Sequence, residues 1–235
     1  LYSKYGLDEA LLKQLGYNPK NHKLNLKPWI DLQKKIKKRK HKVKIAVVGK
    51  YTNLKDSYKS LNEALVHGGI ENSADVDIQW INSEKENNIS LIKKLKGCDG
   101  ILIPGGFGIR GINGKINAIK YARENNIPFF GICLGMQLAV IEIAQNVLKI
   151  KNAHSSEFKK TTKSVVGLMT EWINKNKIEK RDKNSDKGGT MRLGAYKAVL
   201  KKNSKIFSIY KNKVISERHR HRYEVNQKFL SKFEN

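Results

Sequence analysis

The chain has 235 residues and a mass of 26.8 kDa, which suits one large domain or one domain with a short appendage. Hydrophobic residues make up 39%, which excludes a fully disordered chain, and two cysteines exclude a fold built on several disulfides. The net charge of +26 raises the question of nucleic-acid binding, but 39 of the 47 basic residues are lysines and only residues 34–44 form a dense cluster, so we interpret most of this charge as solvated surface.

The predicted elements fall into two parts. Residues 1–42 show a helical pattern at Asp8–Leu15 and a second helix that begins at Pro28, without any strand pattern, and we interpret them as a linker arm. From Val43 onward, strands and helices alternate. The buried-strand patterns are Val43–Gly49, Val76–Ile81, Gly100–Ile103 and Pro128–Ile132. The helical patterns are Asp56–His67, Ile89–Lys96, Gly114–Asn125 and Leu134–Leu148.

This alternation predicts an α/β fold with a doubly wound, mostly parallel sheet. Beyond Lys149, shorter strand patterns predict an antiparallel extension of that sheet; they are Val165–Met169, Gly194–Leu200 and Val214–Glu217. The most apolar stretch, residues 127–143, is interrupted by Pro128, glycines and Glu142. It therefore predicts a buried strand and helix and no membrane span.

The strongest local motif surrounds Cys133. A buried strand ends there and a helix begins at once, with Gly131 and Gly135 two residues to either side. Such a G-x-C-x-G turn is the cysteine counterpart of the nucleophile elbow, and the helix N-terminus favours a thiolate. The sequence predicts that Cys133 is a nucleophile and that Cys98, which lacks the glycine frame, is a packing residue.

A glycine-rich turn, Pro104-Gly105-Gly106-Phe107-Gly108, follows the strand Gly100–Ile103. Its glycine spacing matches a dinucleotide fingerprint, but it follows the third strand and Glu124 lies within a helix, so we reject that interpretation. We instead expect a backbone N–H of this turn and the N–H of Leu134 to form an oxyanion hole beside the nucleophile.

The segment Glu217–Asn226 alternates arginine and histidine. On a strand, Arg218, Arg220 and Arg222 would share one side and both histidines, His219 and His221, the other. Either histidine is a candidate base for the cysteine, and an exposed charged edge strand is the alternative. By pattern alone, Glu157 is a carboxylate in a loop with a structural role.

Several motifs together resemble the glutamine amidotransferase domain of CTP synthase, a class I amidotransferase with a cysteine nucleophile and a flavodoxin-like sheet. The motifs are PGGFG, GICLGMQ, SSEF, TEW, GGTMRLG and ERHRHRYEVN. The resemblance runs from Lys44 to Asn226. It implies that residues 1–42 are the interdomain linker and tail of an amidoligase (synthetase) domain, and that residues 43–235 are the amidotransferase domain with its C-terminal part apparently missing.

The resemblance also implies roles for single residues. Cys133 would form a γ-glutamyl thioester with L-glutamine, and Gly106 and Leu134 would supply oxyanion and substrate contacts. The remaining substrate-binding positions are Gly135, Met136, Gln137, Glu157 and Arg222, of which Glu157 would hold the α-ammonium and Arg222 the α-carboxylate. Phe107 and Arg110 would lie in a lid near a site for the activator GTP. No metal or cofactor is expected in this domain.

For the whole protein, the resemblance implies that ammonia released from glutamine reaches a synthetase domain of the same polypeptide. That domain would bind ATP, UTP and Mg²⁺ and aminate UTP to CTP. The protein would be a cytoplasmic homotetramer that binds neither membranes nor nucleic acid.

One departure from the family is clear. The family completes its triad with a His-Pro-Glu motif, and no His-Pro-Glu occurs in these 235 residues. The resemblance places His219 and His221 in the glutamine-binding segment, so it implies that neither is the catalytic base. We therefore expect these residues alone to hydrolyse glutamine poorly, because Cys133 lacks a base. The alternatives are another class I amidotransferase, such as one that feeds GMP, anthranilate or carbamoyl-phosphate synthesis, and a non-catalytic, basic α/β module that binds nucleic acid.

Overall fold

The computed structural model describes residues 2–21, 24–52, 54–168, 171–174, 177–180 and 191–234. Three predicted positions lie outside these residues: Met169, Thr170 and the segment Gly188–Thr190. The chain divides into two compact units. One comprises Leu1–Lys42 with Glu63–Asp75, and the other comprises Val43–Asn62 with Val76–Asn235.

The first unit is helical. Its elements are η1 (Tyr2–Tyr5), α1 (Leu7–Gln14), η2 (Pro19–Asn21), α2 (Lys27–Lys37) and most of α3 (Lys59–Glu71). Pro28 lies in the first turn of α2, where a missing backbone N–H costs nothing. Lys35 Nζ lies 2.6 Å from a Glu71 carboxylate oxygen, and Arg39 lies 2.7 Å from Asp75. Part of the lysine-rich cluster is therefore paired with carboxylates of its own unit.

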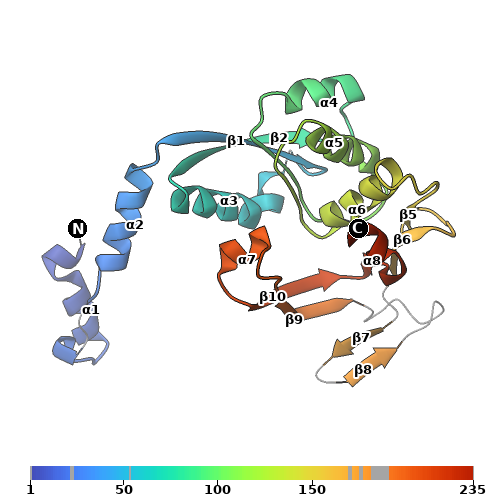
Figure 1. Cartoon of the computed structure of the whole chain (residues 1–235). Helices are drawn as coiled ribbons and strands as arrows, with labels where there is room; N and C mark the ends of the chain where they lie inside the picture. The colour runs from blue at the N-terminus through green and yellow to red at the C-terminus, as the bar shows by residue number, and fades with distance from the viewer. Residues whose placement is uncertain are drawn as a thin grey trace. The chain divides into compact units, whose positions relative to one another are not determined.

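The second unit is built on a four-stranded sheet in the order β2-β1-β3-β4. Figure 1 labels two of these neighbouring strands, β1 and β2. The strands are β1 (His41–Gly49), β2 (Ala74–Asn82), β3 (Gly100–Ile103) and β4 (Phe129–Gly131). β1 pairs in parallel with β3, and β3 pairs in parallel with β4. The chain winds outward from β1 in both directions, which is the doubly wound order. The predicted α/β fold with a mostly parallel sheet is confirmed.

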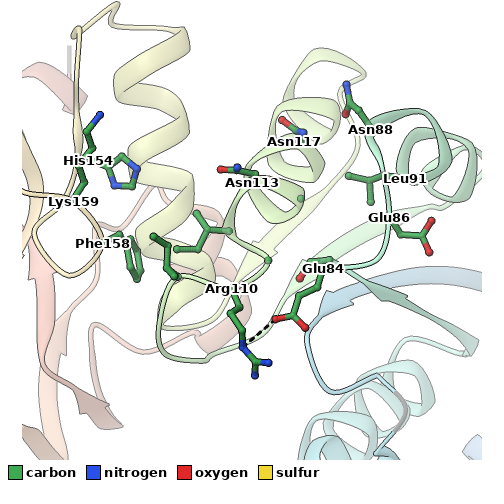
Figure 2. Close-up of a pocket in the computed structure, with 15 residues that line it drawn as sticks. Glu84, Glu86, Asn88, Leu91, Arg110, Asn113, Asn117, His154, Phe158 and Lys159 are labelled. Atoms are coloured by element: carbon green, nitrogen blue, oxygen red, sulfur yellow. Dashed lines mark ion pairs between the residues drawn. The ribbon is translucent and has the colours of Figure 1, made fainter.

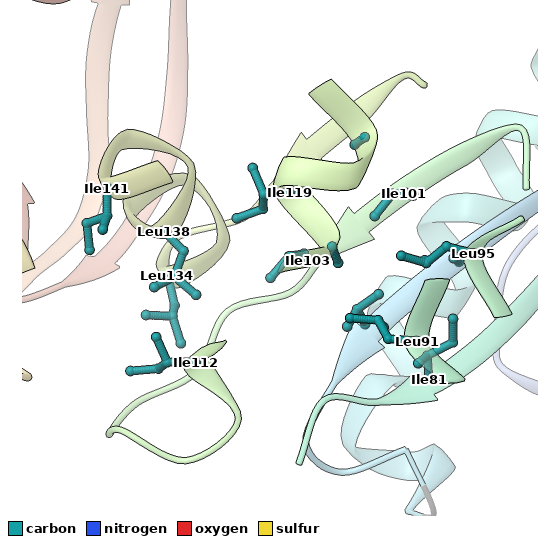
Figure 3. Packing of buried hydrophobic residues seen from close by; sticks show 14 of the residues in the cluster. Ile81, Leu91, Leu95, Ile101, Ile103, Ile112, Ile119, Leu134, Leu138 and Ile141 are labelled. Atoms are coloured by element: carbon teal, nitrogen blue, oxygen red, sulfur yellow. The ribbon is translucent and has the colours of Figure 1, made fainter. Parts of the chain in front are cut away.

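Three helices of this unit pack against one another: α4 (Asn88–Leu95), α5 (Ile112–Glu124) and α6 (Leu134–Asn146). Leu134, Leu138 and Ile141, at helical spacing, form the buried side of α6 (Figure 3). They join a core that includes Ile103 of β3 and Ile119 of α5. The core holds the end of β3 and the start of α6 close together, which fixes the site described below.

The remaining elements are short. They are η3 (Lys55–Tyr58) before α3 and, after α6, β5 (His154–Ser155), β6 (Ser164–Leu168), β7 (Glu171–Asn174), β8 (Lys177–Lys180), β9 (Arg192–Val199), α7 (Lys205–Tyr210), β10 (Val214–His221), β11 (Tyr223–Val225), η4 (Gln227–Phe229) and α8 (Leu230–Glu234).

The predicted antiparallel pairing is present here in β9–β10, β7–β8 and β6–β11. Within the described residues, however, these strands form three separate sheets and do not extend the four-stranded one. The chain leaves the central sheet at the end of β4, and the strands after α6 pair with one another instead.

Candidate functional site

Cys133 stands in a strained turn between β4 and α6. Its backbone has φ 51° and ψ −103°, outside the regions that a residue with a side chain prefers. A β-carbon at Gly131 would lie 2.5 Å from the backbone of Gly135 and Met136, and one at Gly135 would lie 2.1 Å from the carbonyl oxygen of Ile103. Only glycine fits on either side of the cysteine, so the predicted elbow is confirmed as a local geometry.

The glycine-rich turn after β3 lies against this elbow. A β-carbon built on Gly105 would be 3.6 Å from the β-carbon of Cys133, and one on Gly106 would be 3.4 Å from the Leu134 side chain. The structure thus brings Gly106 beside Leu134 and Cys133. An oxyanion hole needs N–H groups from two segments near one reacting atom, and the turn and the start of α6 are two such neighbouring segments.

The surroundings of Cys133 favour the protonated thiol over the thiolate. Burial raises the pKa of Cys133 and the charge of Glu157 raises it further, while the N–H of Leu134 opposes both by hydrogen bonding to the sulfur. The helix N-terminus acts as expected, because the N–H of Leu134 lowers the pKa of the thiol, but desolvation outweighs this hydrogen bond and the net pKa is raised. The Sγ atom also lies 3.9 Å from the carbonyl oxygen of Arg220, an acceptor for a protonated thiol.

Glu157 reaches the same site from the loop after β5. Its carboxylate accepts a hydrogen bond from the N–H of Gly108 at 3.1 Å, which ties the glycine-rich turn to this loop. Burial raises the pKa of the Tyr223 phenol, and the negative charge of Glu157 raises it further. The positive charge of Arg222 lowers it. The charges of Glu157 and Arg222 therefore both act on the Tyr223 phenol, and the hydrogen bond from Gly108 agrees with the structural role that the pattern predicts for Glu157.

Arg222 is half-buried, and its Nε atom is buried without a hydrogen-bond partner. A buried donor without an acceptor costs about 1–3 kcal/mol, so this group calls for an explanation, and a ligand that accepts its hydrogen bond is one. Because the group is a cation with planar N–H donors, the partner that suits it is a carboxylate.

The other predicted substrate-binding positions differ from one another. Gln137 is buried, and its side-chain amide donates to the carbonyl oxygen of Tyr223 at 2.9 Å. Met136 is partly exposed, and Gly135 packs against Ile103. Gln137 is therefore engaged with the protein backbone and holds β11 against α6.

Lys50 is a buried residue beside the glycine-rich turn that the sequence analysis did not single out. Lys50 is 8% exposed, and its Nζ donates to the carbonyl oxygens of Phe107 at 2.5 Å and Gly108 at 3.4 Å. It therefore anchors the glycine-rich turn to the end of β1. The signal was a lysine at the carboxyl end of a buried parallel strand, where ligand sites form.

A pocket of about 640 Å³ opens next to this turn (Figure 2). Arg110 lines it and pairs with Glu84 at 3.3 Å, while His154 of β5 and Phe158 of the loop after β5 face it. Phe107 is 59% exposed and is not among the lining residues. The two predicted effector residues are therefore not brought together by this pocket.

The histidines of β10 do not reach the thiol. His219 and His221 are half-buried on one side of the strand while Arg218 and Arg220 are exposed, as the alternation predicts. Their rings pair with each other, and no histidine of the described residues is hydrogen-bonded to Cys133.

The described residues hold no group of three or more His, Cys, Asp or Glu side chains placed to bind a metal ion. Among the helices of the same residues, none combines the length and apolar composition that a membrane crossing needs. Cys98 is buried in the core, and burial raises its pKa, which fits the predicted packing role.

Comparisons with known proteins agree with this geometry. Residues 53–234 match the family model described as glutamine amidotransferase class-I. CTP synthase from Rhizobium johnstonii is 52% identical over 237 residues, which cover 100% of this chain and 43% of that protein. CTP synthase from Pelagibacter ubique is 58% identical over 212 residues, which cover 89% of this chain and 39% of that protein. The chain thus spans about two fifths of the length of these relatives.

A solved structure supports the same relationship. The glutaminase domain of CTP synthase from Trypanosoma brucei, with bound acivicin, superimposes with a TM-score of 0.70 at 41% identity. The match covers 82% of this chain and 71% of that one.

Proposed function

This chain belongs to the class I glutamine amidotransferase family, as the glutaminase part of a CTP synthase, and from that premise we propose that Cys133 releases ammonia from the side-chain amide of L-glutamine. The observation that carries the proposal is the strained elbow at Cys133 with Gly106 and Leu134 beside it. A nucleophile and N–H donors from two segments are the minimum that acyl transfer requires.

In the proposed reaction, the sulfur of Cys133 attacks the amide carbon of glutamine, and the thiol proton passes to the departing nitrogen. The N–H groups of Leu134 and Gly106 stabilise the oxyanion. Ammonia leaves as the C–N bond breaks, and a γ-glutamyl thioester remains. Water then cleaves the C–S bond, which gives glutamate and restores the thiol. Removing one such oxyanion donor typically costs about 10²–10³ in rate.

The charged groups of the site suit the two ends of an amino acid. We assign the α-ammonium to Glu157 and the α-carboxylate to Arg222, whose buried Nε has no hydrogen-bond partner among the described residues. Charge-assisted hydrogen bonds of this kind are about twice as strong as neutral ones.

A raised pKa at Cys133 means that attack needs a base. The described residues offer none at the thiol, and the family's His-Pro-Glu motif is not found in these 235 residues. We therefore propose that this stretch alone turns glutamine over slowly and that the complete protein supplies the base.

In the complete protein, we propose that the ammonia serves a synthetase domain of the same polypeptide, which uses ATP and Mg²⁺ to phosphorylate UTP and then replaces the phosphate with ammonia to give CTP. GTP is the proposed activator, and a cytoplasmic homotetramer is the proposed state. Residues 1–42 are the proposed linker and synthetase tail. The similarity of the whole chain to CTP synthases supports this over another class I amidotransferase.

The test is covalent labelling with acivicin or diazo-oxo-norleucine, followed by peptide mass spectrometry. We expect the label on Cys133, protection by glutamine, and no label on Cys98. Cys133→Ser should abolish labelling and Cys98→Ser should leave it unchanged. Labelling at Cys98, or labelling that glutamine does not slow, would contradict the proposal.

A further inference from the structure

A line of hydrogen bonds runs from β10 to α6 beside the elbow. His219 Nδ1 lies 2.9 Å from His221 Nε2, and His221 Nδ1 lies 3.2 Å from the carbonyl oxygen of Tyr223. The same carbonyl oxygen accepts a hydrogen bond from the side chain of Gln137 at 2.9 Å. Two side chains from different elements therefore fix the position of one backbone group.

These contacts determine where the ring protons lie. A carbonyl oxygen only accepts, so Nδ1 of His221 must carry a hydrogen. In the neutral ring, Nε2 of His221 is then an acceptor, and the donor to it is Nδ1–H of His219. Burial lowers the pKa of His219, and the charge of Arg192 lowers it further, so a neutral His219 ring, which still donates through Nδ1–H, is favoured.

Arg222 lies in the chain between His221 and Tyr223, which are linked by the hydrogen bond from the His221 ring to the Tyr223 carbonyl oxygen. β10 ends at His221 and β11 begins at Tyr223, so Arg222 is the single residue that joins them. β10 pairs with β9 whereas β11 pairs with β6, so the backbone changes from one sheet to another at this residue. Its direction at that point is set by the His221 ring on one side and the Tyr223 carbonyl group on the other.

The same segment also contacts the nucleophile. The carbonyl oxygen of Arg220 lies 3.9 Å from the sulfur of Cys133, and Gln137 lies one helical turn after the cysteine. A displacement of the segment would therefore move the guanidinium relative to the thiol. The two histidine rings make no hydrogen bond to the thiol, so they act through the backbone and not on the reacting atoms.

We propose that His219 and His221 form a positioning pair that directs Arg222 toward the α-carboxylate of the amino-acid substrate. The inference rests on the proposed function, because it presupposes that Arg222 binds that carboxylate. Its alternative is the exposed, purely structural edge strand that the sequence pattern left open.

The test uses the full-length protein that carries this chain, with glutamine-dependent and ammonia-dependent CTP formation measured in parallel. His221→Phe removes the donor to Tyr223, and His221→Asn keeps an N–H group near the place of Nδ1. We expect His221→Phe to raise the KM for glutamine about tenfold, which is the scale of one hydrogen bond, with kcat within about twofold. His221→Asn should restore the KM to within about threefold, and ammonia-dependent activity should stay unchanged in both.

Two controls keep the outcomes separate. Arg222→Met should raise the KM for glutamine at least as much as His221→Phe. An unchanged KM in Arg222→Met would overturn the carboxylate assignment in the proposed function, whereas a raised KM in Arg222→Met together with an unchanged KM in His221→Phe would overturn only the positioning pair. His67→Phe, at an exposed histidine of the other unit, should change neither constant.

If His221→Phe does not fold in the full-length protein, His219→Phe replaces it, since it removes only the donor to His221. In that variant we expect the rate of Cys133 labelling by acivicin, which carries an α-amino acid group, to fall about threefold, within the scale of one hydrogen bond. Labelling by iodoacetamide, which has no carboxylate, should be unaffected. An equal fall in both rates, or no fall in either, would refute a positioning role.

Discussion

The elbow at Cys133 depends on glycine at position 135, and Gly135→Ala tests this directly. The added β-carbon would lie 2.1 Å from the carbonyl oxygen of Ile103. That oxygen cannot move freely, because it accepts a hydrogen bond from the N–H of Ile132 at 2.9 Å and belongs to β3, which is paired on both sides. Relief of the clash therefore requires α6 to shift away from the sheet.

Overpacking of this kind costs about 1–3 kcal/mol, and contact with fixed backbone puts Gly135→Ala near 3 kcal/mol. For a domain of this size, the melting temperature should fall by about 6–12 °C. Because Cys133 precedes the shifted helix, labelling by acivicin should slow about tenfold or more, since misplacement by about 1 Å can cost a hundredfold.

Gly68→Ala is the matched control. Gly68 lies within α3, and a β-carbon there meets nothing within 4 Å. Alanine is favoured over glycine in a helix by about 1 kcal/mol, so this variant should melt about 2–4 °C higher and react at the parent rate. If Gly135→Ala melted and reacted like the parent in thermal unfolding and labelling assays, the close approach of α6 to β3 would be wrong.

Two further predictions concern buried lysines near the glycine-rich turn. Burial lowers the pKa of Lys115 to about 8, and the charge of Lys50 adds to this effect. In the unfolded chain, the Lys115 side chain keeps its proton up to a pH of about 10.4, so the free energy of unfolding should rise with pH between about 8 and 10.4. Lys115→Met should remove that rise and increase the free energy of unfolding by about 3 kcal/mol at pH 7. Urea unfolding at pH 7 and pH 9.5 measures the pH dependence and the difference between parent and variant, and an equal stability of the two at pH 7 would contradict the burial of a charge. Lys50→Met removes the donor to the carbonyl groups of Phe107 and Gly108, so acivicin labelling of Cys133 should slow about tenfold. Lys120→Met, at a surface lysine, should leave the labelling rate unchanged.

The parts of the structure that the sequence predicted are those that short-range stereochemistry decides. Gly131 and Gly135 frame Cys133 because any β-carbon there would meet backbone a few residues away or on the adjacent strand. Apolar runs such as 45–48 and 100–103 identify buried strands for a similar reason, since both faces of a central strand are covered. Both features can therefore be recognised from residues that are close to one another in the sequence.

What the sequence could not predict depends on residues far apart in the chain. The electrostatic environment of Cys133 includes Glu157, which arrives through a loop after α6, and burial that the whole fold creates. Lys50 holds carbonyl groups of a turn 57 residues away. The separation of the later strands from the central sheet likewise depends on pairing partners and not on local pattern, so the predicted extension was wrong while the antiparallel pairing was right.

Within the proposed function, Glu157 affects the protonation of the Cys133 thiol before the substrate binds. In the free site, its negative charge and the burial of the sulfur both disfavour the thiolate, so the residue is less open to oxidation and to stray electrophiles. When the ammonium group of a substrate pairs with Glu157, the repulsion from that carboxylate is offset, and the substrate carbonyl group arrives beside the N–H of Leu134. Within the proposed function, substrate binding at Glu157 would therefore reduce only the smallest of the three effects on the pKa of Cys133, and burial of the sulfur, the largest, would remain.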